Sequence, residues 1–215
     1  MTTESRLREH IVRLSKSLFD RGFSVGSAGN ISAAVEDGIL MTPTNSCLGF
    51  LDPARISKLD RNGNLVSGDK PSKEIFLHRA FYETRRQTGA VVHLHSTYAT
   101  ALSCLADTDA EDCIPPLTPY VVMRVGRVRL IPYVRPGDEK AGDLIRDLKG
   151  AYAAVLLANH GPVVTGHDIE SAVYASEELE ETAKLLVLLR GAPIRLLTDD
   201  HVQELKAVFG EGLKR

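Results

Sequence analysis

Apolar β-like segments alternate irregularly with amphipathic helical patterns along this chain of 215 residues. Apolar residues at helical spacing, followed by Gly22, predict a first helix over residues 4–21. Short apolar or β-branched runs predict strands at residues 31–35, 39–42, 90–95, 128–131 and 153–158. Some of these strands are joined by short turns, and others are separated by helices. We therefore expect a mixed sheet in an α/β layered domain.

Capping residues predict where several helices begin. The candidates are Asp52 before Pro53, Ser72 before a helix to about Arg86, and Asp168 before the longest helix, which ends at Gly191. The run from Val121 to Val125 suggests a further strand. The chain is long enough to bury most of its apolar surface in one core, so we predict a single domain over residues 1–215.

Charge and composition exclude several classes of partner. The 26 basic and 28 acidic side chains nearly cancel, and no run of like charge suggests nucleic-acid binding or a polybasic membrane anchor. No segment approaches the length of an apolar membrane span, and the N-terminal residues lack the apolar core of a signal peptide. Cys47, Cys104 and Cys113 fit reduced thiols. We expect a cytoplasmic protein whose partners are small molecules.

Three histidines occur at the ends of predicted strands. Alternate side chains share one face of a strand, so His93 and His95 should point the same way, and His160 follows the apolar run 153–158. Three neutral imidazoles on zinc leave a coordination position open, as a catalytic site requires. Histidines at strand ends are also often hydrogen-bonded structural residues. The other four, His10, His78, His167 and His201, have no partner spacing, and we interpret them as solvated or structural.

Polar residues in turns offer further candidates. Glu74 falls in the first turn of a predicted helix, where free N–H groups favour anions, and a capping carboxylate is the simpler interpretation. Backbone amides and hydroxyls can form anion nests around Ser27, Asn30, Thr44 and Ser72. Ordinary turns have the same composition, so this pattern alone leaves both interpretations open.

Five separated motifs together resemble the class II aldolase/adducin family. They are Gly26-Ser27-Ala28-Gly29-Asn30-Ile31-Ser32, Thr42-Pro43-Thr44, Pro71-Ser72-Lys73-Glu74, His93-Leu94-His95 and Asn159-His160-Gly161. Their order and spacing match the family from the first helix to about Thr198. The resemblance implies a three-layer α/β/α sandwich with a central mixed β-sheet, commonly assembled as a homotetramer with active sites at subunit interfaces.

The resemblance also implies roles for individual residues. His93, His95 and His160 would bind one divalent metal per subunit, zinc or else manganese or cobalt. Glu74 would act as the acid/base and would ligate the metal when substrate is absent. A phosphate site would be made by Asn30, Thr44, Asn45 and Ser72, with Ser27 and Gly29 shaping its loop. Tyr120 would donate a proton, often across a subunit boundary.

Within the family, four segments resemble the decarboxylases that act on 3-oxo-tetronate 4-phosphate, a sugar acid phosphate: residues 44–49, 68–74, 93–105 and 119–124. The family's aldolases usually have Ser-Ser-Glu where this chain has Ser72-Lys73-Glu74. The implied reaction releases carbon dioxide and gives dihydroxyacetone phosphate through a metal-chelated enediolate. Our hypothesis is that Lys73 or Arg124 contacts the carboxylate or phosphate of the substrate; surface ion pairs are the alternative.

Two other functions remain open at this stage. An aldolase or epimerase acting on fuculose 1-phosphate or ribulose 5-phosphate would use the same metal site, and fold analogy does not separate these reactions. A non-catalytic, adducin-like assembly module would be expected to lack the histidine ligands. The three histidines therefore favour an enzyme, a metal-dependent carbon–carbon lyase.

Overall fold

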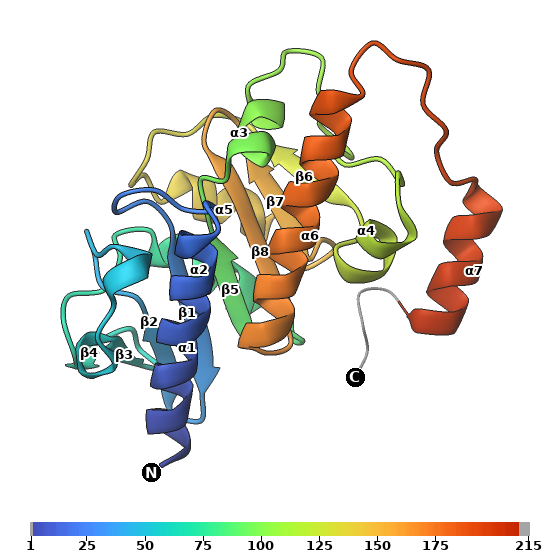
Figure 1. Ribbon diagram of the computed structural model, residues 1–215. Helices are drawn as coiled ribbons and strands as arrows, with labels where there is room; N and C mark the ends of the chain where they lie inside the picture. Colours follow the sequence, from blue (N-terminus) through green and yellow to red (C-terminus); the bar gives the residue numbers. More distant parts are fainter. Residues whose placement is uncertain (1, 211–215) are drawn as a thin grey trace.

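The computed structural model describes residues 2–210, and their strands form one mixed sheet (Figure 1). The strands are β1 (Asn30–Val35), β2 (Gly38–Met41), β3 (Ser57–Asp60), β4 (Leu65–Ser67), β5 (Ala90–His93), β6 (Val128–Ile131), β7 (Ala154–Leu157) and β8 (Gly161–Gly166). Their order across the sheet is β4-β3-β2-β1-β5-β8-β7-β6. Only β6 and β7 pair in parallel; the other described pairs are antiparallel. The predicted mixed sheet is confirmed.

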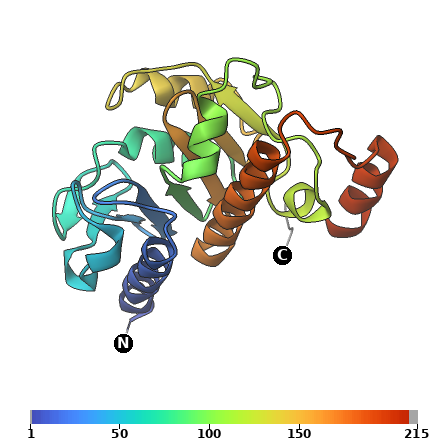
Figure 2. The ribbon, with the colours of Figure 1, turned by 45° about the horizontal axis from the view of Figure 1, so that its top comes forward.

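Helices cover both faces of this sheet. They are α1 (Thr3–Asp20), α2 (Ile75–Thr84), α3 (Thr97–Ser103), α4 (Pro119–Arg124), α5 (Lys140–Arg146), α6 (Ile169–Leu188) and α7 (Asp199–Phe209), with short 3-10 turns at Leu48–Phe50 and Pro53–Arg55. Helices α1, α3 and α6 pack on one face, and α2 and α5 pack on the other (Figure 2). This is the expected three-layer sandwich. No helix within residues 2–210 is long and apolar enough to cross a membrane.

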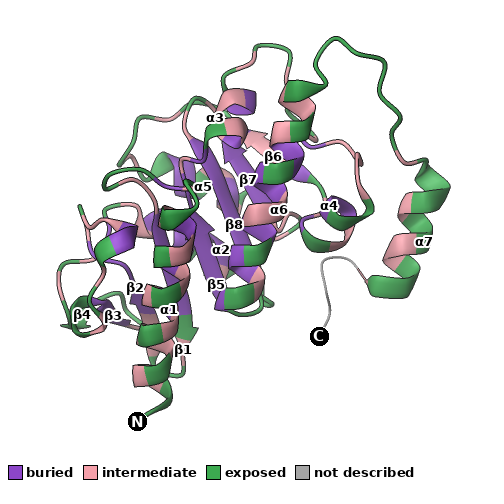
Figure 3. Cartoon of the chain, viewed as in Figure 1, coloured by how far each residue is buried: buried purple, intermediate pink, exposed green. Residues whose placement is uncertain are grey.

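The central strand β5 shows why the sheet is buried on both faces. Val92 packs in the core between the sheet and helices α1 and α6, whereas Val91 packs against α2 and α5. Successive side chains of a strand point to opposite faces, so a run of apolar residues can supply both layers. Figure 3 accordingly shows the central strands as buried and the outer surfaces of the helices as exposed. His93 ends this strand and is itself fully buried.

The structure differs from the predicted secondary structure in one element and one helix start, and α6 ends at Leu188, shortly before the predicted Gly191. Residues Val121 to Val125, predicted as a strand, belong to or cap α4, which begins with Pro119 and whose Val121 N–H donates to the Thr118 hydroxyl. The β-branched residues misled the prediction, because their apolar face is buried in the core shared with α6 and β6.

The second difference concerns the start of α2. The sequence predicts Ser72 as the cap of this helix, but Glu74 occupies the capping position. The Ser72 hydroxyl instead accepts a 3.3 Å hydrogen bond from the Glu74 N–H, which makes a tight turn just before the helix. By contrast, the predicted cap Asp168 forms a reciprocal capping box with Ser171 at the start of α6.

Candidate active site

Four side chains converge where β5 and β7 end. The ligating atoms of Glu74, His93, His95 and His160 all lie within 4.8 Å of one another. The Nε2 atom of His95 is 3.2 Å from His93 Nε2 and 3.0 Å from His160 Nε2. Glu74 Oε2 is 3.4 Å from His93 Nε2, and Glu74 Oε1 is 3.5 Å from His160 Nε2. One ion at the centre of this cluster would be within reach of all four groups.

The histidine pair is not held by strand alternation alone, contrary to the expectation from the sequence. Strand β5 ends at His93, and His95 lies in the loop before α3. This loop is fixed by the buried carboxylate of Glu180 on α6, which accepts hydrogen bonds from the Ser96 hydroxyl and the Ala99 N–H. Glu180 thus positions His95 from the neighbouring layer. No local sequence pattern marks this role of Glu180, because it depends on α6 packing beside α3.

Close backbone contact brings His160 to the other two histidines. A Cβ atom on Gly161 would stand 2.3 Å from the carbonyl oxygen of Leu94, and Gly161 has a φ of +157°. Only a residue without a side chain allows the two segments to approach this closely. Gly29 does the same on the other side, because a Cβ there would be 3.0 Å from the His93 carbonyl oxygen.

The donor set fits a divalent metal. His93 Nδ1 donates a 2.8 Å hydrogen bond to the carbonyl of Pro162, which leaves the Nε2 lone pair facing the cluster. Ligands about 2.1 Å from a tetrahedral metal are separated by about 3.4 Å, close to the spacing of these nitrogens. The lone pairs of three unprotonated Nε2 atoms that face one another repel unless a proton or a cation lies between them.

Burial keeps these imidazoles neutral. It lowers the pKa of His93 well below the usual value, and the neighbouring His160 and His95 lower it further. The pKa values of His95 and His160 are also lowered, chiefly by burial. Neutral imidazole is the form that binds metal, so the environment prepares the ligands for it.

Glu74 is held in the cluster by Asn30. The Asn30 side chain is buried next to His93 in the β1–β5 register, and its Nδ2 donates a 2.9 Å hydrogen bond to Glu74 Oε2. Its Oδ1 is 2.6 Å from His78 Nε2. Of the two interpretations offered for His78, solvated or structural, the structure supports the structural one, because His78 is fully buried and both ring nitrogens have hydrogen-bond partners. An amide nitrogen carries two hydrogens, and the bond to Glu74 uses one of them.

The predicted phosphate-binding segments lie side by side at this edge of the sheet. The Thr44 N–H donates to the Lys70 carbonyl at 2.9 Å, and the Ser72 N–H donates to the Thr42 carbonyl at 3.2 Å. These bonds bring the segments 42–45 and 70–74 together beside Glu74. Asn45 has a φ of +56°. The side chains of Asn45, Ser27 and Lys73 are all exposed.

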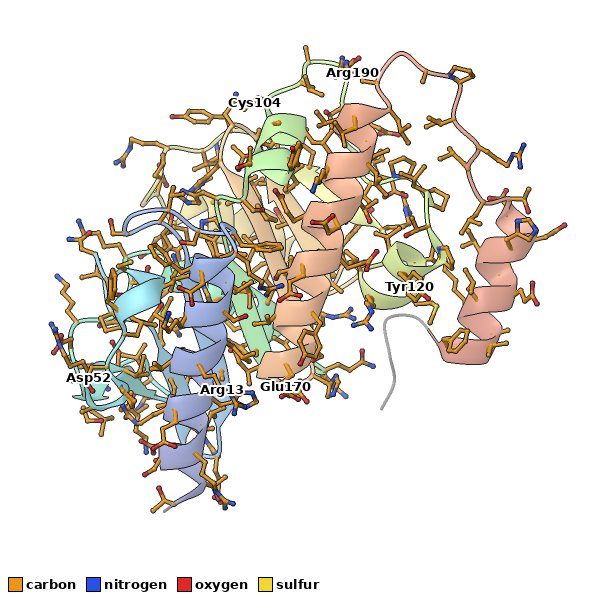
Figure 4. All side chains as sticks on the ribbon, in the orientation of Figure 1. Arg13, Asp52, Cys104, Tyr120, Glu170 and Arg190 are labelled. Carbon is orange, nitrogen blue, oxygen red and sulfur yellow. The ribbon has the colours of Figure 1, made fainter. Side chains whose placement is uncertain are left out.

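Tyr120 and Arg124 lie elsewhere. Both line a surface hollow between α4 and α6, together with Tyr174 and Glu177, and neither lines the pocket next to Glu74 and His160. The side chain of Tyr120 is 58% exposed, and Figure 4 shows it on the flank formed by α4, α6 and α7. Within one subunit, the structure therefore does not bring these two residues to the histidine cluster.

An arginine that the sequence analysis did not select lines the pocket beside the cluster. Arg135, in the segment between β6 and α5, lines this pocket with Glu74, His160 and Leu157. Its side chain is exposed at the pocket mouth. No spacing in the sequence connects Arg135 to the histidine motifs, because the connection depends on how β6 pairs with β7.

Comparisons with known proteins agree with this geometry. Residues 9–187 match the family model described as "Class II Aldolase and Adducin N-terminal domain". The chain is 52% identical to the 3-oxo-tetronate 4-phosphate decarboxylase of Pectobacterium atrosepticum over 95% of this chain and 94% of that protein. It is 34% identical to the L-fuculose phosphate aldolase of Methanocaldococcus jannaschii, over 84% of this chain and 96% of the other.

A solved structure gives the same assignment. The crystal structure of YgbL from Escherichia coli superimposes with a TM-score of 0.93 at 50% identity, over 95% of this chain and all of that one. The family model, near-full-length identity and the shared fold all point the same way. On this evidence the chain belongs to the class II aldolase and adducin family.

Proposed function

We propose that this chain decarboxylates 3-oxo-tetronate 4-phosphate to dihydroxyacetone phosphate and carbon dioxide. The observation that carries the proposal is the convergence of three Nε2 atoms and one carboxylate, in a chain half identical over nearly its full length to decarboxylases of this name. The substrate is a β-keto acid. When its C1–C2 bond breaks, the electron pair is delocalised toward the C3 oxygen, and C2 must then accept a proton.

His93, His95 and His160 would hold the metal, with Glu74 as a fourth ligand when no substrate is bound. Class II aldolases depend on a divalent metal, and the chain has the donor set for one. When bound, the metal supplies a Lewis acid that withdraws electrons from substrate oxygens. We propose zinc, because three imidazoles with an open position suit its catalytic sites; manganese and cobalt are the alternatives.

Glu74 would carry the proton that C2 requires. Its carboxylate lies beside the metal position and accepts a hydrogen bond from Asn30, so its location is defined before substrate binds. A proton carrier must lie within hydrogen-bond reach of the reacting atom, and Glu74 meets this condition for a substrate bound at the histidine cluster. Glu74→Gln removes one proposed ligand, so we expect it to weaken metal binding by about tenfold and to abolish most turnover even when the metal is saturating.

The anionic groups of the substrate need partners at the pocket mouth. We propose that Thr44, Asn45 and Ser72, with the second N–H of Asn30, bind the phosphate in a loop shaped by Ser27 and Gly29. Arg135, in the segment after β6, lines the pocket beside Glu74, and Lys73 is exposed directly before Glu74 in the chain. Either cation could pair with the substrate carboxylate, which distinguishes this substrate from that of an aldolase.

Tyr120 and Arg124 would act across a subunit boundary. Large apolar side chains are exposed on α4, α6 and α7, namely Tyr120, Tyr174, Leu185, Leu188, Val208 and Phe209. Exposed apolar surface of this kind indicates an interface between proteins. We propose a homotetramer in which α4 of one subunit presents Tyr120 to the histidine cluster of another.

The proposal places each chain in the cytoplasm as a single domain over residues 1–215, of which Met1 and 211–215 lie outside the described residues. The free cysteines Cys47, Cys104 and Cys113 suit a reducing compartment.

One experiment separates this function from its closest alternative. The metal-loaded protein is assayed for carbon dioxide release from 3-oxo-tetronate 4-phosphate and, in parallel, for aldol addition of dihydroxyacetone phosphate to lactaldehyde. We expect release of carbon dioxide and formation of dihydroxyacetone phosphate in equal amounts. Aldol addition without carbon dioxide release would show that the chain is an aldolase, as its similarity to the fuculose-phosphate aldolases allows.

A further inference from the structure

A chain of hydrogen-bonded side chains runs from Glu74 into the core behind the histidine cluster. Beyond Asn30, which bonds to Glu74 at 2.9 Å, it continues through His78, whose Nε2 is 2.6 Å from Asn30 Oδ1. His78 Nδ1 is 2.7 Å from the Ser32 hydroxyl, which lies 2.8 Å from the Tyr82 hydroxyl. Ser32 and His78 are fully buried, and Asn30 is 4% exposed. Of the residues in this chain of hydrogen bonds, only Glu74 belongs to the group of candidate metal ligands.

Two regular spacings of polar residues, one on α2 and one on β1, build this chain of hydrogen bonds. Glu74, His78 and Tyr82 follow each other at intervals of four residues at the start and along one face of α2, and Asn30 and Ser32 alternate on one face of β1. Four helical residues rise about 6 Å, and two strand residues rise about 6.7 Å. The helix and strand can therefore interleave their polar groups in step over the whole length of the chain.

The chemistry of the end groups fixes every proton in the chain. Asn30 presents its NH₂ to Glu74 Oε2, so its Oδ1 is the atom that faces His78. His78 Nε2 must then carry the proton. Burial lowers the pKa of His78 to about 3, so the ring is neutral and its Nδ1 accepts from the Ser32 hydroxyl. The Ser32 oxygen in turn accepts from Tyr82.

We infer that His78 is a positioning residue, which in its Nε2-protonated tautomer fixes the orientation of the Asn30 amide and thereby the position of the Glu74 carboxylate. Without the His78 N–H, the Asn30 amide can turn over and direct its oxygen at Glu74. Two oxygens would then face each other, and the carboxylate would move from its place beside His93. The importance of this for catalysis rests on the proposed function, but the effect on Glu74 does not.

Cobalt binding tests the inference without substrate. Co²⁺ is titrated into the metal-free protein, and its visible absorption bands report the ligand set that includes Glu74. We expect His78→Phe to weaken Co²⁺ binding by about tenfold and to change the absorption bands, since loss of an outer partner of a ligand typically costs 10–100-fold. His78→Gln retains an N–H donor that reaches about as far as Nε2, and it should restore much of the wild-type spectrum.

A control variant separates positioning from loss of stability. Phe81→Leu alters the same helix in the same apolar core without touching the hydrogen-bonded chain, and it should bind Co²⁺ as the wild type does. If His78→Phe matches Phe81→Leu in both affinity and spectrum, the inference is wrong. Should His78→Phe fail to fold, Ser32→Ala decides the question, because it removes the donor to Nδ1 with little change in volume; unchanged Co²⁺ bands would overturn the inference.

Turnover adds a second readout. If the wild type releases carbon dioxide, His78→Phe should lower kcat more than it changes KM, because Asn30 is the one proposed phosphate-binding residue that it disturbs, whereas Thr44, Asn45 and Ser72 stay in place. If the wild type releases none, the proposed function fails, and the Co²⁺ comparison still decides the role of His78.

Discussion

The hydroxyl of Ser96 donates a 2.7 Å hydrogen bond to the buried carboxylate of Glu180, directly after the metal-ligand candidate His95. The same carboxylate accepts from the backbone N–H groups of Tyr98 and Ala99, both at 2.8 Å. One side chain of α6 thus caps α3 and anchors the loop that carries His95. The Glu180 carboxylate therefore connects helix α6 to the candidate site.

Replacing Glu180 should therefore disturb both stability and the site. Glu180→Gln turns one acceptor into a donor that faces N–H or O–H groups, and we expect it to lower the free energy of unfolding by about 2–4 kcal/mol. Metal affinity should fall as the His95 loop loosens. Glu181→Gln, at an exposed position on the same helix, is the matched control and should change the free energy of unfolding by less than about 0.5 kcal/mol. Urea denaturation and metal titration measure the two effects.

Gly161→Ala tests the close approach of the two ligand segments. The new Cβ would stand 2.3 Å from the Leu94 carbonyl oxygen, so the backbone must shift and carry His160 with it. We expect metal affinity to fall by roughly tenfold or more and stability by about 1–3 kcal/mol. Gly126→Ala is the control, since Gly126 also has a positive φ, of +73°, but a Cβ there would meet no neighbouring atom of the described residues within 4 Å. Equal metal affinity in the two variants would contradict this prediction.

Metal removal should lower the thermal stability of the wild type but not of a ligand variant. A metal that binds only the folded state stabilises it by about 4 kcal/mol at a thousandfold excess over its Kd. Chelation should accordingly lower the Tm of the wild type, and added zinc should restore it. His95→Ala, which removes one of the converging nitrogens, should show little response to either treatment. His167→Ala, at a distant and partly exposed position, should respond as the wild type does. A scanning calorimeter measures all three.

The burial of His78 predicts a pH dependence of stability. Its pKa is about 3 in the folded protein and about 6.5 when unfolded, so between these values the unfolded state binds a proton that the folded state does not. Stability must fall as pH falls through this window, by up to about 1.4 kcal/mol per pH unit for this residue. His78→Gln should reduce the slope of the unfolding free energy between pH 6 and pH 5, roughly, by an amount approaching this value. Denaturant titrations at several pH values measure the slope, and an unchanged slope would refute the assignment.

Features that depend on neighbouring residues were predictable from the sequence. The cap at Asp168, the hairpin of β1 and β2 and the apolar strand β7 follow from local chemistry, and the structure confirms them. Where tertiary packing overrides local preference, prediction failed. The valines of α4 favour a strand locally, but a proline start, the Thr118 cap and burial against α6 make them helical.

In the candidate site, too, local spacing was predictable from the sequence and long-range contacts were not. The spacing of His93 and His95 suggested that both could ligate one metal, and the structure brings both to His160. The roles of His78 and Glu180 were not visible, because each depends on a helix packing against a segment distant in sequence. His78 becomes a partner of Asn30 only when α2 lies along β1, and Glu180 reaches the His95 loop only when α6 lies beside α3. Such long-range relationships leave little trace in a single sequence.

Subunit mixing tests whether Tyr120 acts on a neighbouring subunit. Tyr120 lies on an exposed flank and lines a hollow that contains none of the four cluster residues, so a catalytic role requires a second subunit. We expect Tyr120→Phe and Glu74→Gln each to be nearly inactive as pure proteins. When equal amounts are unfolded, mixed and refolded together, a site can combine the intact Glu74 of one subunit with the intact Tyr120 of the next. Random assembly would then restore about a quarter of wild-type sites.

A second mixture controls for activity regained without a shared site. It combines Glu74→Gln with a variant of the same histidine cluster, His95→Ala, because both changes fall within the residues that one subunit supplies. That mixture forms no site with Glu74 and His95 both intact, so it should stay inactive. Persistent inactivity of the first mixture, with mixed oligomers demonstrated by mass spectrometry, would exclude a shared site and return Tyr120 to a purely structural role on its flank.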